Sequence, residues 1–502
     1  MFTLTRQRGI EFSFIVIAIS LFIKLLCIGS NDLLAEEAYY WNYSVHLDIG
    51  YLDHPPMVAV LIKLFTTLFG NNEFGVRIAS IVCWLATALF SFKLTHLIRP
   101  GAGKYAVMLL AILPFFFLHS LVITPDLPLI VCWAASLYYL YRAQVLDNKI
   151  SWYAAGIWLG LGVLSKYSIL LLGPAALLYL IWLPHARKMF LKKEPYACVL
   201  LMILFFTPVI YWNATHDWAS FVFQSTRRLE ETSSFSFHHL LGLLIVFLTP
   251  LGLLGFITLF RHNKPESYWL DIKTKRFLQI YTLVPLAVFS LFSLRHEIKF
   301  NWIGPCMLAV IPWLAILIDK TKSSLRTGWL ITSIILLLGY SFMILCIIFG
   351  RPERINQQLF SKYIAWSDLT RQVHAIAVDV ESNMHTTPFI VPMDVYNIAS
   401  ELAFYQAKLL EHGEIHKIYT PIGGDLFGRN SLMYRYWSQG KVAAGNVLIL
   451  IDENPVKFEE PQVSARVIAK SETKALWSHS QGVGMKIRPY YYKVVQLKEV
   501  GG

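Results

Sequence analysis

Residues 157–182 read IWLGLGVLSKYSILLLGPAALLYLIW, an apolar run that Lys166 and Tyr167 interrupt. A helix needs about 20 apolar residues to cross the hydrocarbon core of a bilayer. Similar runs recur along the chain, in which 56% of the 502 residues are hydrophobic and only 15% are charged. A soluble domain usually has about 25% charged residues. The sequence therefore predicts a polytopic α-helical membrane protein that contacts the lipid bilayer.

The apolar runs predict eleven transmembrane helices. An odd number of spans places the two ends of the chain on opposite sides of the membrane. The first run follows a short basic tail, as in a signal peptide, but its length favours an uncleaved helix. The predicted spans lie near residues 10–29, 77–97, 105–122, 127–142, 151–164, 168–184, 197–212, 238–260, 277–294, 301–318 and 327–349.

Lys and Arg cluster in every second break between these runs. Short loops rich in Lys and Arg stay on the cytoplasmic side of the membrane. Membrane topology therefore explains the net charge of +12, and nucleic-acid binding is not expected. The remaining breaks should face the periplasm of a bacterium, and they hold all the unusual motifs. The basic breaks are at 6–8, 93–104, 142–149, 187–193, 261–276 and 320–326.

The composition divides the chain into two domains. Residues 1–350 form the transmembrane domain, with a long first external loop at 30–76. Residues 55–69 in that loop have apolar side chains at helical spacing, which predicts a helix lying in the membrane interface. Residues 351–502 predict a small extracytoplasmic α/β domain, with strands at 389–392, 447–451 and 492–497 and a helix at 397–410.

Two adjacent acids, Glu36 and Glu37, follow the first predicted span. A carboxylate that is desolvated at a membrane surface can serve as a general base. The aromatic residues Tyr39 and Tyr40 come directly after them and are candidates for binding substrate. The alternative is a pair of solvated loop acids beside an ordinary interfacial aromatic belt.

Three further motifs in external breaks each have a functional and a structural interpretation. Asp53 and His54 could hydrogen-bond a sugar or phosphate, or they could simply precede a helix that starts with proline. Asp126 lies close to the hydrocarbon, where a carboxylate is costly and usually functional, although Asp is also a common N-cap. Lys166 beside Tyr167 could bind a phosphate, or it could extend toward water along the apolar surface.

Two other polar segments complete the candidate site. One combines tryptophans with hydrogen-bonding groups and runs from 213 to 228, and the other is the densest polar cluster beside a span. The first segment could instead be an interfacial tryptophan belt, and the second could be a charged hairpin whose charges neutralise one another. Carboxylates together with cations at the membrane boundary suit transfer from a lipid phosphate. The candidate substrate-binding residues are Asn213, His216, Arg295, Glu297, Lys299 and Asn301.

The sequence assigns no cofactor. A divalent metal could bind among Glu36, Glu37, Asp53 and His54, but their spacing shows no fixed ligand pattern, so the metal is left open. The six cysteines form no CxxC pair and lie in or beside apolar runs. We expect them to be buried packing thiols.

The order of these motifs resembles the bacterial branch of the protein mannosyltransferase family. These are GT-C glycosyltransferases, and their relatives include the aminoarabinose transferase of lipid A and the lipopolysaccharide galacturonosyltransferases. The resemblance covers residues 10–320 and is carried by 36–41, 50–56, 124–129, 166–167, 213–221 and 297–302. The family's loop typically has Asp followed by Glu, whereas this chain has Glu36 followed by Glu37, so either acid could hold the family's role.

The resemblance implies that one sugar moves, with inversion, from a polyprenyl-phosphate donor to a periplasmic lipid or glycan acceptor. Lipid A and lipopolysaccharide core are the leading acceptors, and protein hydroxyl groups are the alternative. Glu36, Glu37 and Asp126 would be catalytic. A transporter of lipid-linked sugars would instead need polar residues deep in its spans. A non-catalytic assembly protein would leave the loop carboxylates unexplained.

Overall fold

The structure is a computed structural model that describes residues 2–225, 234–261, 269–320, 323–349, 364–479 and 486–498. The chain divides into two compact units. The helical unit comprises Met1–Leu26, Ile49–Val58 and Ala79–Ser341. The α/β unit comprises Cys27–Asp48, Ala59–Ile78 and Phe342–Gly502, so most of the first external loop packs with the C-terminal part of the chain.

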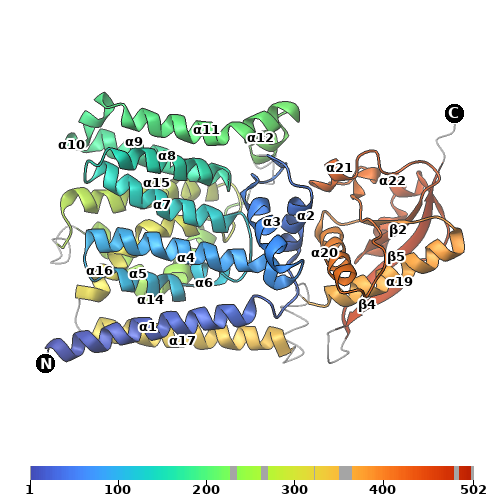
Figure 1. Cartoon of the computed structure of the whole chain (residues 1–502), viewed down its shortest axis with the longest axis horizontal. Helices are drawn as coiled ribbons and strands as arrows, with labels where there is room; N and C mark the ends of the chain where they lie inside the picture. Colours follow the sequence, from blue (N-terminus) through green and yellow to red (C-terminus); the bar gives the residue numbers. More distant parts are fainter. Residues whose placement is uncertain are drawn as a thin grey trace. The chain divides into compact units, whose positions relative to one another are not determined.

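Each of the eleven predicted spans contains helix, and within the helical unit the long helices run roughly parallel (Figure 1). The helices that lie wholly or mainly in this unit are α1 (Phe2–Cys27), α4 (Glu73–Ile98), α5 (Gly103–Ile112), α6 (Pro114–His119), α7 (Asp126–Gln144), α8 (Ile150–Val163), α9 (Leu172–Trp182), α10 (Pro184–Arg187), α11 (Glu194–Thr215), α12 (Ala219–Gln224), α14 (Phe237–Phe260), α15 (Ile272–Ser293), α16 (Ile311–Lys320) and α17 (Ser323–Phe349).

Five helices in the described part of the chain are long and apolar enough to cross a membrane: α4, α11, α14, α15 and α17. A sixth crossing is possible if α9 and α10, with the turns that flank them, form one span bent by 108°. The chain therefore has the helices of a multi-pass membrane protein. Eleven spans remains a prediction.

Two of the predicted transmembrane segments are interrupted at a proline, which the sequence analysis did not predict. The segment 105–122 is split because Leu113 is extended (ψ 132°) before Pro114, which begins α6. Within α14, Thr249 has φ 61° before Pro250, and the helix is kinked there. The segments at 168–184 and 301–318 instead begin with 3-10 turns, η1 (Tyr167–Leu171) and η4 (Gly304–Ala309).

The α/β unit contains a five-stranded sheet with the order β1-β2-β5-β3, and β4 also pairs with β5. Strands β1 and β2 are parallel, and β5 is antiparallel to β2, β3 and β4. The three predicted strands are confirmed as parts of β1, β2 and β5, whereas β3 and β4 were not predicted. The bounds are β1 (Phe389–Pro392), β2 (Val447–Asp452), β3 (Val467–Ala469), β4 (Lys474–His479) and β5 (Lys486–Leu497).

The longer helices of the α/β unit are α2 (Ala35–Val45), most of α3 (Met57–Phe69), α19 (Trp366–Met384) and α20 (Asn397–Glu411), and the unit also contains the short helices α21 (Tyr434–Trp437) and α22 (Pro461–Ser464). The predicted helix at 397–410 is confirmed as α20, which packs against α2 and α19. The predicted loop helix is confirmed as α3, and its Val60, Leu64 and Leu68 are exposed. An exposed apolar stripe suits a helix that lies at a membrane surface.

Candidate active site

The helical unit places a buried charged group at the start of α7. The Nζ of Lys166 lies 2.8 Å from Oδ1 of Asp126, and the Nδ2 of Asn301 donates to Oδ2 at 2.7 Å. Asp126 is 3% exposed and is the first residue of α7, whose N-cap is Pro125. The carboxylate is therefore held by a cation and an amide instead of capping the helix. Three of the predicted site residues meet here although they are far apart in the sequence.

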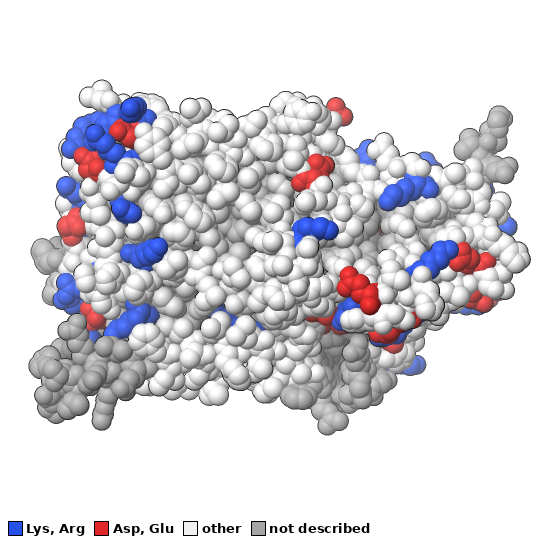
Figure 2. Space-filling model, viewed as in Figure 1, with Lys and Arg blue, Asp and Glu red and all other residues white. Residues whose placement is uncertain are grey.

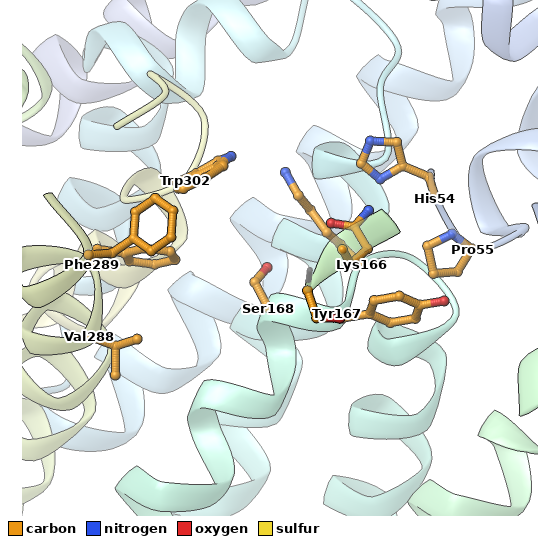
Figure 3. A pocket seen from close by; sticks show the side chains of 11 residues that line it. His54, Pro55, Lys166, Tyr167, Ser168, Val288, Phe289 and Trp302 are labelled. Atoms are coloured by element: carbon orange, nitrogen blue, oxygen red, sulfur yellow. The ribbon is translucent and has the colours of Figure 1, made fainter. Parts of the chain in front are cut away.

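Lys166 also lines a cavity of about 290 Å³ in the same unit. Figure 3 shows its amine between Trp302 on one side and His54 on the other. The ammonium group of Lys166 therefore lies near the polar residues that line the cavity. Aliphatic and aromatic side chains line the rest of the cavity wall. The lining residues are His54, Pro55, Lys166, Tyr167, Ser168, Gln224, Ser225, Val288, Phe289, Phe292 and Trp302.

The apolar wall was missed by sequence reasoning. Val288, Phe289 and Phe292 come from α15 and face the cavity together with Trp302. An apolar stripe on a predicted span does not reveal whether it faces lipid, a neighbouring helix or a binding site. The combination of the Lys166 cation with an apolar wall suits an amphipathic ligand with an anionic head.

The loop that carries Asp53 and His54 is fixed to the helical unit from two directions. The side-chain amide of Gln224 donates to the backbone oxygen of Asp53. Gly50 lies against Trp212 so closely that an added Cβ would be 2.6 Å from the Cγ of that ring. The absence of a side chain at Gly50 therefore allows the loop to approach α11.

We expect Gly50→Ala to lower activity without unfolding the helices, because the new methyl group must push the loop away from Trp212. A displacement of about 1 Å at a catalytic group can lower the rate by about tenfold or more. Gly173→Ala is the matched control, since no atom lies within 4 Å of a Cβ added there. The comparison is a transfer assay on the two purified variants, and equal activity would contradict this role for Gly50.

Several predicted site residues do not line this cavity. Asn213 is fully buried, and its Oδ1 accepts hydrogen bonds from the backbone of Ser220 and Phe221, so its side chain fixes the turn after α11. The ring of His216 stacks on Trp212 with centroids 4.1 Å apart. Arg227 and Arg228 of the same loop lie outside the described residues.

In the charged hairpin before η4, some of the predicted site residues lie at the site and others do not. Arg295, Glu297 and Lys299 have exposed side chains and are not among the residues lining the cavity, whereas Asn301 reaches Asp126. Tyr167 does line the cavity, and its hydroxyl lies 3.0 Å from Oγ of Ser220. The sequence predicted that the whole hairpin belongs to the site. It did not show which of its residues are exposed and which, like Asn301, reach Asp126.

The two loop acids belong to the α/β unit and differ sharply. Glu37 is fully buried, and its carboxylate accepts hydrogen bonds from the guanidinium of Arg77 at 2.7 and 3.0 Å. Arg77 also donates to the backbone oxygens of Asn31 and Asp32. Glu36 is exposed and lines a second cavity, within the α/β unit.

The aromatic candidates that follow these acids are buried within the α/β unit. Tyr39 packs against Tyr396 with ring centroids 4.6 Å apart, and its hydroxyl accepts a hydrogen bond from the backbone of Met433. Tyr40 packs against Tyr43. These contacts join the first external loop to the C-terminal segment, and neither tyrosine lines the cavity beside Lys166.

Among the described residues, no group of three or more His, Cys, Asp or Glu side chains is placed to hold a metal ion. The four candidate metal ligands also belong to two different units. Glu36 and Glu37 belong to the α/β unit, and Asp53 and His54 belong to the helical unit. All six cysteines are buried and none forms a disulfide with another, as expected for packing thiols.

Comparison with known proteins shows that the chain has an ArnT-like GT-C fold and that part of it matches a glycosyltransferase family model. Residues 53–212 match the model of the dolichyl-phosphate-mannose-protein mannosyltransferase family. The chain aligns with the structure of ArnT from Cupriavidus metallidurans bound to undecaprenyl phosphate over 96% of its length and 97% of that chain, with a TM-score of 0.64 and 14% identity. The family resemblance predicted from the motifs is thereby confirmed.

Two further relatives support the same class. The lipid A galacturonosyltransferase RgtD of Rhizobium johnstonii is 26% identical over 197 residues, which is 39% of this chain and 41% of that protein. The chain thus spans about two-fifths of the length of this relative. An oligosaccharyltransferase of Archaeoglobus fulgidus aligns with 88% of this chain and 69% of its own, with a TM-score of 0.50 and 14% identity.

Proposed function

We propose that the protein transfers a single sugar from a polyprenyl-phosphate donor to a periplasmic acceptor, with lipid A or lipopolysaccharide core as the leading candidate, and with inversion at the anomeric carbon. The observation that carries this proposal is the cavity in which Lys166, held by Asp126, faces an apolar wall from α15. A lipid phosphate has the matching chemistry, because its head is anionic and its chain is apolar. The names of the relatives point to the same donor and acceptor classes.

In this proposal Lys166 stabilises the phosphate as it departs. An acceptor oxygen attacks the anomeric carbon, and the bond between that carbon and the phosphate oxygen breaks with its electron pair going to the phosphate. A positioned ammonium group stabilises the charge that develops on the leaving oxygen. Asp126 holds the ammonium group in place, Asn301 holds Asp126, and His54 and Tyr167 contact the same ligand.

We assign the role of base or orienting acid to Glu36. Glu37 is the less suitable candidate because its carboxylate is already bound by Arg77 inside the α/β unit. If the acceptor is a hydroxyl, Glu36 takes its proton as the new bond forms. If the acceptor is a phosphate, it is already anionic and needs no base, and Glu36 stabilises the positive charge that develops on the sugar.

We further propose that the N-terminus is cytoplasmic and that the site and the α/β unit are periplasmic. Figure 2 shows Lys and Arg gathered at one end of the helical unit, around α10. Lys188 and Lys192 there pair with Asp147 at the surface. Loops rich in Lys and Arg remain in the cytoplasm, which supports this orientation.

The test is a donor-consumption assay on the purified protein in detergent, with polyprenyl-phosphate sugars as donors and lipid A as acceptor. Wild-type protein should release polyprenyl phosphate and add one sugar mass to lipid A. Glu36→Gln should slow transfer by about 10²-fold if Glu36 is a base. Glu414→Gln is the control, since Glu414 is an exposed partner of Arg371. Full transfer by Glu36→Gln would remove the base role, and no donor consumption by wild type would overturn the proposed function.

A further inference from the structure

The α/β unit contains a polar cavity of about 460 Å³ beside the ends of two parallel strands. Asp394 follows β1, and Asp452 is the last residue of β2. In open sheets with parallel strands, ligands bind in the crevice outside the carboxyl ends of those strands. The cavity is lined by Ala35, Glu36, Trp366, Asp394, Tyr396, Asn397, Ile398, Asp452, Glu453, Lys457 and Arg488.

Both cations of this cavity are already paired. The Nζ of Lys457 lies 2.7 Å from Oδ2 of Asp452, and Arg488 forms an ion pair with Glu453. Four carboxylates therefore face two cations, and each cation is neutralised by one of them. The other two carboxylates, those of Glu36 and Asp394, leave the cavity with an excess of negative charge, so a phosphate or uronate is disfavoured here.

The two carboxylate oxygens of Asp394 have different surroundings. Its Oδ2 accepts hydrogen bonds from the backbone of Asn397 at 2.7 Å and Ile398 at 3.2 Å, which caps α20. Its Oδ1 is buried and has no hydrogen-bond partner among the described residues. A buried carboxylate oxygen without a partner is costly, and a ligand that supplies a hydrogen-bond donor would remove that cost.

The other lining groups indicate what kind of donor fits. Tyr396 offers aromatic surface, and Asn397 adds an exposed side-chain amide. Carboxylates and amides accept hydrogen bonds from hydroxyl and amino groups, while aromatic rings cover the apolar faces of a ligand. A sugar ring presents both kinds of surface.

We propose that this cavity binds a sugar ring that presents hydroxyl or amino groups and carries no phosphate or carboxylate. An amino sugar should bind more tightly than its neutral counterpart, because the ammonium group meets an excess of carboxylates. This inference rests on the proposed function in one respect, which is that the ring belongs to the acceptor.

The test is saturation-transfer NMR on the full-length protein in detergent, with glucosamine, glucose and glucuronate as probes near neutral pH. Glucosamine should bind most tightly and glucuronate most weakly. Asp394→Asn keeps a side-chain oxygen to cap α20 but removes the charge, so glucosamine binding should weaken about tenfold. Glu472→Gln, an exposed acid that does not line the cavity, should leave binding unchanged.

The pH dependence gives a second readout. Burial and the nearby Asp452 raise the pKa of Asp394 to about 6, against the opposing effects of its backbone hydrogen bonds and of Lys457. The charged groups that face it are Glu36, Asp452, Glu453, Lys457 and Arg488. Because a raised pKa means that the carboxylate is lost as the pH falls through about 6, glucosamine affinity should fall there. Asp394→Asn should lack this step.

Two outcomes would overturn the inference: glucuronate binding as tightly as glucosamine, or Asp394→Asn binding glucosamine like wild type. The test is separate from the proposed function, because it measures binding without a donor. A protein that consumes donor but ignores glucosamine would contradict this inference alone. A protein that binds glucosamine but consumes no donor would contradict the transferase proposal alone.

Discussion

Lys166→Met is expected to lower sugar transfer by about 10²-fold or more, the cost of removing a positioned charge from a developing anion. The variant also removes the cation that pairs with the buried carboxylate of Asp126, which keeps its hydrogen bond from the side-chain amide of Asn301. Both effects oppose binding of a lipid phosphate in the cavity. The measurement is the rate of polyprenyl-phosphate release by the purified variant.

Lys188→Met is the matched control for this prediction. The side chain of Lys188 is 61% exposed and pairs with Asp147, so its replacement should leave transfer unchanged. Lys166→Arg should recover part of the activity because it restores the charge, although a guanidinium does not reproduce the geometry of an ammonium group. Transfer by Lys166→Met at the wild-type rate would show that the phosphate is bound elsewhere.

Arg77→Met is expected to destabilise the α/β unit strongly. The side chains of Arg77 and Glu37 are 5% and 0% exposed, and Arg77 also bonds the backbone that precedes α2. Removing one partner of a buried ion pair costs about 3–5 kcal/mol, because the other charge stays buried without compensation. The expected result is a large fall in the Tm of the purified protein, with loss of the fold of the first external loop.

Arg371→Met provides the comparison, because Arg371 and Glu414 are 45% and 42% exposed and such pairs contribute about 0–1 kcal/mol. The double variant Arg77→Met with Glu37→Met should regain much of the lost stability, since neither charge is then left alone. A small effect of Arg77→Met would mean that water reaches Glu37 and that the pair does not anchor the loop.

The helices were predictable because a bilayer imposes a length on each apolar run and the Lys/Arg pattern marks alternate loops. The positions of the breaks within segments were harder to predict. The sequence shows Pro114 and Pro250, but whether a proline ends a helix or is absorbed as a kink depends on neighbouring helices. The grouping of the first external loop with the C-terminal segment depends on contacts such as that of Glu73 with Lys408, which have no local sequence signal.

The candidate site was likewise predictable only in part. Asp126 and Lys166 were predictable because each is a charge beside or within an apolar run, where it is rarely tolerated without function. The wall formed by α15 was not predictable, because its apolar residues look like those of any span. The cavity beside Asp394 was also missed, since Asp394 and Asp452 follow two strands that are distant in the sequence and become neighbours only in the parallel sheet.

The central claim is sugar transfer to a lipid A or core acceptor, and mass spectrometry of these lipids tests it most directly. The strain to use lacks the gene and is complemented with the wild-type chain or with Glu36→Gln. The account predicts that one sugar mass disappears with the gene and returns fully only with wild type. Lipid A and core spectra that are identical with and without the gene would contradict it.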